Sequence, residues 1–215
     1  MAHTNKKSVV YEPMNFPKLK EIERDNRKSL IINAAERVFT QLAFDKVTMR
    51  HIAKEAGITA TAIYRYFTDK QCLYAEAYIR SNNRLLVRIM EDMNASKDFR
   101  LEEITMIIID HFAREEQNLK MRTHFMIDDT LNNEVLSSIN ESFRVFLIEI
   151  VNYFTRFNPD GDVRLLARMY IASLNGLLIT LRKYPGKNRE EIIKQMRTGG
   201  SLLASMFKMQ ILRNR

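Results

Sequence analysis

The sequence predicts an all-α protein, and three features of its composition and patterning support this fold class. Only 6 of its 215 residues are Gly and 4 are Pro, while residues with high helix propensity are abundant. Long stretches repeat apolar residues at spacings of three and four, the period of a helix with one buried face. Turn-forming residues gather between those stretches. We expect a small three-helix N-terminal domain followed by a larger helical domain.

The N-terminus divides into an arm and a first helix. Residues 1–19 contain Pro13 and Pro17 and lack apolar periodicity, so they predict a flexible arm. From Lys20 to about Thr40 the chain predicts a helix with one buried face, formed by Ile31, Ala34, Ala35, Val38 and Phe39.

Three short helical starts then follow between residues 48 and 71. Thr48 precedes a short apolar pattern that ends at Gly57, a residue suited to the positive φ of a helix C-terminus. Thr59 can cap a third helix that ends near Tyr66, and Thr68 with Gln71 forms a capping-box pattern that opens a fourth. The closely spaced short helices predict a helix-turn-helix.

The rest of the chain has longer amphipathic segments, near 69–93, 99–119, 121–131, 133–157, 162–184 and 189–212. The clearest turns are residues 158–161 and 184–186, which contain Pro and Gly, whereas the boundaries near 96, 120 and 132 have weaker signals. We therefore divide the chain into an arm (1–19), a helix-turn-helix domain (20–70) and a larger helical domain (71–215), whose expected role in effector binding and dimerisation follows from other features.

The charge distribution favours a polyanionic partner. The net charge is +8, and residues 1–70 hold 13 Lys and Arg against 8 Asp and Glu. Because this excess lies beside the helix-turn-helix and not along one amphipathic helix, double-stranded DNA is favoured over a membrane surface. Cys72 is the only cysteine, and neither a signal peptide nor an apolar stretch of about 20 residues is apparent. We expect a cytoplasmic protein with no membrane partner.

The predicted packing of the helix-turn-helix gives its exposed surface. A small apolar interface would let the two helices cross closely, formed by Ile52, Ala53, Ala56 and Ile58. Ile63 and Phe67 would anchor the third helix from below, so that Thr59, Ala60, Thr61 and Ala62 face outward toward a DNA groove.

These residues resemble the TetR family of bacterial regulators. The resemblance rests on residues 31–35 with Phe39, then on Thr48, Ile52-Ala53, Ala56-Gly57-Ile58, Ile63-Tyr64, Tyr66-Phe67 and Lys70. It implies a homodimer that binds DNA. The resemblance implies that Thr48 and Arg50 contact DNA phosphates and sometimes a base. It also implies that Tyr64 and Lys70 contact phosphates and that Arg65 and Tyr66 contact bases or the DNA backbone. Thr48 could equally be a plain helix cap, Tyr66 simple packing and Lys70 a solvated surface lysine.

Three positions depart from the family pattern, namely Ala43, Thr61 and Ala62, so the operator sequence cannot be copied from relatives. Ala62 offers a methyl group that could touch thymine, and Thr61 adds a hydrogen-bond donor. Further positive charge lies at Lys18, Lys20, Arg27 and Lys28, for which a solvated surface is the simpler interpretation.

Many Met and Phe residues between 99 and 157 hint at an adaptable apolar cavity, and the family resemblance strengthens this hint. Polar groups near these apolar runs are candidates for contact with a small-molecule effector, although each could instead be a core or surface group. The candidate pocket residues are Asp110, His111, Arg114, His124, Phe125, Asp128 and Tyr170.

Small side chains at helical spacing in the penultimate helix, including Ala172, Ser173, Gly176 and Thr180, predict close approach of another helix. The final helix has an apolar stripe interrupted by Gly199-Gly200. We therefore expect a four-helix dimer interface containing Ala172, Gly176, Met196, Leu203 and Phe207, with burial inside one subunit as the alternative.

No enzyme signature is recognisable in the sequence. None of the four His residues has a Glu-x-x-His pair, and neither a Cys cluster nor a phosphate-binding glycine loop occurs. We expect no catalytic residues, no metal and no cofactor. The sequence predicts a repressor that an apolar or amphipathic effector releases from a palindromic operator; the alternative is a similar DNA-binding protein controlled by a protein partner.

Overall fold

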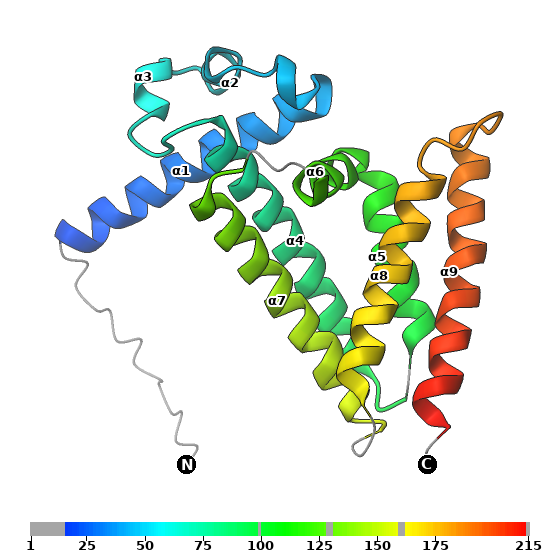
Figure 1. The fold of residues 1–215 in the computed structure, drawn as a ribbon. Helices are drawn as coiled ribbons and strands as arrows, with labels where there is room; N and C mark the ends of the chain where they lie inside the picture. Colours follow the sequence, from blue (N-terminus) through cyan, green and yellow to red (C-terminus); the bar gives the residue numbers. More distant parts are fainter. Residues whose placement is uncertain (1–15, 99, 128–130, 159–161, 214–215) are drawn as a thin grey trace, which may run out of the picture.

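The computed structural model describes residues 16–98, 100–127, 131–158 and 162–213, and it is all-α within these ranges. The α-helices follow one another as α1 (Phe16–Gln41), α2 (Met49–Ala56), α3 (Ala60–Ile63), α4 (Lys70–Ala95), α5 (Leu101–Arg114), α6 (Glu116–Ile127), α7 (Asn133–Thr155), α8 (Val163–Leu181) and α9 (Arg189–Leu212). A short 3₁₀ turn, Phe44–Lys46, separates α1 from α2. Figure 1 shows α2 and α3 packed over α1, with α4 leading from them toward the remaining helices. The predicted fold class is confirmed.

Two helix boundaries near the N-terminus differ from the prediction. α1 begins at Phe16, so residues 16–19 of the predicted arm are helical, while residues 1–15 lie outside the described ranges. α3 ends at Ile63, with Tyr64 as its C-cap, and so is shorter than expected. Residues 64–66 form a turn in which the Tyr66 amide donates to the Ile63 carbonyl at 2.8 Å.

The cap of α4 is Asp69 and not part of the predicted Thr68–Gln71 capping box. Asp69 Oδ1 accepts a hydrogen bond from the Cys72 amide at 2.8 Å, whereas the Thr68 hydroxyl lies 3.1 Å from Cys72 Sγ. A carboxylate in this position satisfies an amide that has no partner within the helix and interacts favourably with the helix dipole.

The boundaries in the second half of the chain are partly as expected. α7 is capped by Asn132, whose Oδ1 accepts from the Val135 amide at 2.8 Å, close to the predicted boundary. The break predicted near 120 is wrong, because α5 ends at Arg114 and only Glu115 separates it from α6. The predicted turn at 184–186 is present with Gly186 at φ 73°, whereas residues 159–161 lie outside the described ranges.

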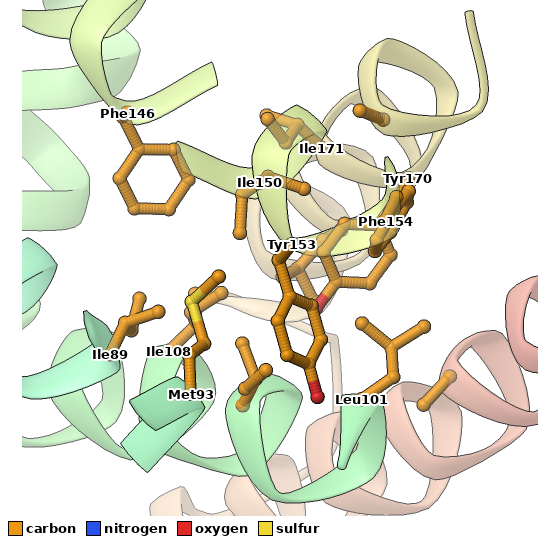
Figure 2. Close-up of a cluster of buried hydrophobic side chains, with 14 of the residues drawn as sticks. Ile89, Met93, Leu101, Ile108, Phe146, Ile150, Tyr153, Phe154, Tyr170 and Ile171 are labelled. Atoms are coloured by element: carbon orange, nitrogen blue, oxygen red, sulfur yellow. The ribbon is translucent and has the colours of Figure 1, made fainter. Parts of the chain in front are cut away.

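The helices surround two buried cores. The first core joins α1–α3 to the start of α4 and also includes α6 and α7, through Met121, Phe125, Val135 and Ile139. The second core lies among α4, α5, α7, α8 and α9; Figure 2 shows Ile89 and Met93 facing Leu101, Ile108, Ile150 and Tyr153. The predicted boundary at residues 70–71 therefore falls at the start of α4, a helix that contributes to both cores.

Helix α9 packs against α5 and α8, and its paired glycines lie at these contacts. A Cβ atom on Gly200 would be 2.2 Å from Ile109 Cδ1 of α5, and one on Gly199 would be 2.8 Å from Leu177 Cδ1 of α8. The paired glycines therefore allow close helix approach within the subunit.

Helix α8 is the one helix within the described ranges that is long and apolar enough to cross a membrane, contrary to the sequence-based expectation. Core helices of globular proteins pass the same test. Ala167, Tyr170, Leu174 and Leu178 of α8 are buried against neighbouring helices, so its apolar composition is explained by the second core.

Replacement of Gly200 by a larger residue should destabilise the protein. In Gly200→Val, the new side chain would overlap Ile109 and Thr105, both of which are fully buried and have little room to move. We expect a loss of about 1–3 kcal/mol in the free energy of unfolding, measured by urea denaturation. Thr198→Val is the control, because this exposed site on the same helix should change stability by less than about 0.5 kcal/mol. Equal effects of the two substitutions would contradict the close approach of α9 to α5.

Candidate nucleic-acid interface

Helix α2 is fixed at both ends by the residues predicted for this purpose. Thr48 Oγ1 accepts from the His51 amide, and His51 Nδ1 accepts from the Thr48 amide, both at 3.3 Å. At the other end, Gly57 adopts φ 67°, a left-handed conformation that residues with a Cβ atom rarely adopt. The cap role of Thr48 is confirmed, and its hydroxyl proton is still available for donation to a phosphate.

The exposed face of α2 carries unpaired positive charge. Arg50 and Lys54 are four residues apart and therefore lie on one face of the helix. Neither makes an ion pair with a carboxylate of the described residues. Glu55, the acidic residue of α2, pairs instead with Arg37 of α1. Lys54 was absent from the predicted contacts, although its spacing from Arg50 in the sequence could have indicated it.

Helix α3 begins at Thr59, whose Oγ1 accepts from the Ala62 amide at 3.2 Å. Thr59 and Thr61 are exposed as predicted, whereas Ala60 and Ala62 are half-buried and Ala60 packs against the first core. Ile58 was expected in the apolar interface but is 39% exposed. The accessible side chains of this short helix are therefore mainly the two threonines.

The residues after α3 extend the exposed surface. Ile63 and Phe67 are buried beneath it, as predicted, and this orientation leaves Tyr64 55% exposed and Arg65 exposed. Arg65 makes no ion pair within the described chain. Tyr66 is half-buried against the first core, so the packing interpretation is confirmed for its ring.

Lys70 has a structural role that the sequence did not predict. Its Nζ donates to the Phe44 carbonyl at 2.7 Å and lies 4.2 Å from the centre of the Phe44 ring. Burial removes water from the ammonium group and thereby lowers the pKa of Lys70. Lys70 is therefore not a freely solvated surface lysine, because it ties the start of α4 to the turn that follows α1.

Two of the basic residues suggested near the arm already have partners. Arg27 pairs with Glu23 of the same helix, and the Lys28 ammonium lies 2.9 Å from a Glu76 oxygen on α4. The hydrogen bond and the charge of Glu23 raise the pKa of Arg27. Lys28 therefore contributes to the packing of α1 on α4 in this structure.

The predicted effector-pocket residues do not gather around one cavity. The rings of His124 and Phe125 contact the Tyr74 ring at the first core, whereas Tyr170 lies in the second core. The Tyr170 hydroxyl is satisfied at 2.8 Å from Thr105 Oγ1. Arg114 is exposed, Asp110 pairs with Arg197, and Asp128 lies outside the described ranges. The prediction of a common pocket is wrong because it grouped residues by sequence region, while the buried residues of α5 and α8 enter the second core and Phe125 of α6 enters the first.

His111 belongs to a buried polar cluster that the sequence analysis missed. Its Nε2 lies 3.3 Å from Ser81 Oγ, and burial lowers its pKa, with Glu115 opposing this shift and nearby arginines reinforcing it. Asn118 donates to the same Ser81 hydroxyl, Arg122 acts on His111 through its charge, and the neighbouring Asn82 of α4 pairs with Ser142 of α7. Ser81 and Asn82 interrupt the apolar stripe of α4, a signal that could have indicated buried polar groups.

An exposed apolar surface covers parts of α8 and α9. Its side chains are Leu165 and Met169 of α8 with Leu202, Met206 and Met209 of α9. Ala172 and Gly176 are also exposed, in agreement with their predicted availability. The prediction that Met196 lies in the dimer contact is wrong, because this side chain is buried within the subunit. Leu203 and Phe207 are half-buried, and Phe207 packs on the Tyr170 ring.

Loss of the Lys70 tether should destabilise the helix-turn-helix. In Lys70→Gln, both the charge-assisted bond to Phe44 and the contact with its ring are weakened, so we expect a loss of about 1–2 kcal/mol in unfolding free energy. Urea denaturation of the variant measures this change. The control is Lys46→Gln in the same turn, an exposed lysine whose removal should change stability by less than about 0.5 kcal/mol. Equal stability of Lys70→Gln and the unmodified protein would exclude this structural role.

Comparisons with known proteins place these features in a family. The model of the bacterial regulatory proteins of the tetR family matches residues 31–77. The fatty acid metabolism regulator protein of Bacillus subtilis is 25% identical over 158 residues, covering 70% of this chain and 80% of that protein. A regulator from Mycobacterium tuberculosis, described as an HTH-type transcriptional repressor, is 29% identical over 91 residues, covering 39% of this chain and 49% of that protein.

Solved structures agree in fold. A tetR-family regulator from Mesorhizobium loti superposes with a TM-score of 0.68 at 19% identity, covering 85% of this chain and 97% of that one. FadR from Bacillus subtilis, in complex with stearoyl-CoA, gives a TM-score of 0.65 at 20% identity and covers 82% and 97% of the two chains. Together with the capped helix-turn-helix over residues 48–67, these matches identify residues 31–77 as a domain of the tetR family of bacterial regulatory proteins, and the fold of the larger helical part agrees with that of TetR-family regulators.

Proposed function

We propose that this protein is a homodimeric repressor that binds a near-palindromic operator and is released by a small amphipathic effector. The observation that carries the proposal is the exposed, positively charged surface of the helix-turn-helix. Its DNA contacts would come from Thr48, Arg50, Thr59, Thr61, Tyr64 and Arg65, with Lys54 as an addition and smaller parts for Ala60, Tyr66 and Lys70.

These side chains suit two kinds of DNA contact. Arg50 and Lys54 can pair with phosphates because no carboxylate of the described residues neutralises them. Thr61 and Arg65 can reach base edges, since a hydroxyl bonds either purine or pyrimidine groups and a guanidinium pairs with guanine through two hydrogen bonds. Affinity would then depend mainly on α2 and sequence preference mainly on α3 and the following turn.

The dimer would form through α8 and α9. Exposed apolar side chains on two adjacent helices are typical of a protein contact surface. In a two-fold dimer the same patch on both subunits would produce a four-helix contact and set the spacing of the two DNA-binding domains. DNA binding would thus lie in residues 20–70 and dimerisation in residues 71–215, as in the division of the chain proposed from the sequence.

Effector control is supported by the relatives. The FadR structure contains stearoyl-CoA, and a regulator from Saccharomonospora viridis, with a TM-score of 0.62, contains choline. The two ligands differ in charge and size, so they support ligand binding in general and do not identify the effector of this chain.

Substitutions on the DNA surface should separate affinity from preference. We expect Arg50→Ala to weaken binding to all duplexes alike and to reduce the slope of log affinity against log salt concentration by about 1. Thr61→Val should instead change the preferred bases, because it removes a hydroxyl without changing charge. Fluorescence anisotropy on duplexes selected by the unmodified protein from a random pool measures both effects.

The control is Arg144→Ala, which removes an exposed arginine on α7, far along the chain from the helix-turn-helix. It should leave affinity and preference unchanged. The DNA assignment would be contradicted if no duplex were enriched, or if Arg50→Ala and Arg144→Ala behaved alike.

A charge placed on the α9 surface should disrupt the dimer. Met206→Glu would bring a carboxylate from each subunit into one apolar contact, where burial and mutual repulsion both oppose association. We expect a shift from dimer to monomer in sedimentation velocity. Val87→Glu, which adds the same charge at an exposed apolar site on α4, should remain dimeric. An unchanged dimer in Met206→Glu would place the interface elsewhere.

A further inference from the structure

Arg122 of α6 is the most unusual charged residue of the described chain. Its relative exposure is 5%, and no carboxylate of the described residues forms an ion pair with it. Its Nε is buried without a hydrogen-bond partner, and its Nη1 reaches only the Tyr78 hydroxyl, at 3.5 Å. A buried guanidinium normally pairs with an acidic group, because an uncompensated charge in the interior is strongly unfavourable.

The immediate surroundings of Arg122 are aromatic. The guanidinium carbon lies 5.7 Å from the centre of the Phe112 ring and 5.5 Å from that of Phe143. These rings stabilise the positive charge through their faces, but they accept no ordinary hydrogen bond from Nε. The site therefore combines a planar set of donors with an apolar lining from α5 and α7.

Polar groups with hydrogen-bonding capacity lie on the helices around the arginine. On α4, one turn beyond Tyr78, the Asn82 amide donates to Ser142 Oγ of α7 at 3.0 Å. Next to Asn82, the Ser81 hydroxyl lies between His111 and Glu115, and Asn118 donates to both Ser81 and Glu115. Such buried hydroxyl and amide groups could reorganise around a polar ligand without loss of all their partners.

The charges facing this cluster have a positive excess. Arg84, Arg88 and Arg122 all act on His111, whereas Glu115 is the one acidic group among its interacting neighbours in the described chain. Glu115 is half-exposed and also lies 3.9 Å from Arg84. With His111 neutral, the balance of these groups favours an anion over a cation.

An open cavity of about 530 Å³ lies beside the cluster. Arg84, Glu115, Asn118 and Met121 are part of its wall. Glu115 and Asn118 also contact Ser81, so this wall adjoins the polar groups around Ser81. Asn118 lies one turn before Arg122 on α6, so the cavity borders the helix that carries the arginine.

From these observations we infer that Arg122 is the anchor for an amphipathic anion, a ligand with a carboxylate or phosphate group on an apolar body. The oxyanion would accept hydrogen bonds from the arginine donors that lack partners, and the apolar body would lie against Phe112, Phe143 and the adjoining core. This inference rests on the proposed function in one respect, since it assigns the chemical class of the effector.

The test compares probes that share an alkyl chain and differ in the head group: decanoate, decyl phosphate and decan-1-ol, with inorganic phosphate as the anion alone. Calorimetric titration of the full chain without DNA should give at least about tenfold tighter binding for one or both amphipathic anions than for the alcohol or for phosphate. Either anion preference supports the assignment. Equal affinity for decan-1-ol, or comparable affinity for inorganic phosphate alone, would overturn it.

Arg122→Met should abolish this preference, so that the anions bind no more tightly than the alcohol. The variant should also raise the Tm of the unliganded protein by about 2 °C or more, because it replaces an uncompensated buried charge with a flexible apolar side chain. The control, Arg144→Met, removes an exposed arginine and should preserve the preference. A lower Tm together with retained anion preference in Arg122→Met would show a purely structural arginine and overturn the inference.

If Arg122→Met does not fold, Arg122→Lys provides the same test, because it keeps the charge and loses the planar pair of donors. It should reduce anion affinity several-fold, and unchanged affinity would count against the inference. The outcome is separable from that of the proposed function. Anion binding at Arg122 without any change in operator affinity would refute release by an effector and leave the site assignment intact.

Discussion

The arrangement of the molecule depends on the burial of one continuous helix, α4, in two hydrophobic cores. Its first turns place Tyr74 and Tyr78 among the apolar residues of α1–α3, and its later turns place Ile89 and Met93 among those of α5, α7 and α8. A helix is stiff over this length, so the packing of the larger helical part directly determines the orientation of the DNA-binding surface. Asp69 and Lys70 secure the same helix at its beginning, the former by capping it and the latter by bonding the turn at Phe44.

Features that depend on a few neighbouring residues could be predicted from the sequence. The caps Thr48 and Thr59 and the left-handed Gly57 follow from local hydrogen bonding and backbone sterics, so the pattern that indicates them also produces them. The same applies to Ile63 and Phe67, whose spacing makes both side chains point beneath α3. These local signals were sufficient to locate the helix-turn-helix.

Features that depend on distant contacts could not be predicted in this way. Both faces of α9 carry apolar side chains, so periodicity could not distinguish Met196, which faces the second core, from Met206, which faces outward. Similarly, Arg122 belongs to a residue type that is mostly exposed, and only the approach of Phe112 and Phe143 from two other helices makes it buried. Lys70 finds its acceptor 26 positions earlier in the chain, beyond the reach of any local pattern.

Helix α6 is short, yet its side chains reach both cores. Arg122 and Phe125 are less than one turn apart on this short helix. Arg122 lies near the Phe112 and Phe143 rings and the Tyr78 hydroxyl, whereas Phe125 contacts the Tyr74 and Tyr78 rings in the core of the DNA-binding part. A helix of this size moves as a rigid rod, and a single residue connects it to α5. Because α6 also packs against α4 and α5, a shift of this short helix would be felt in both cores, so α6 connects the two cores in addition to α4.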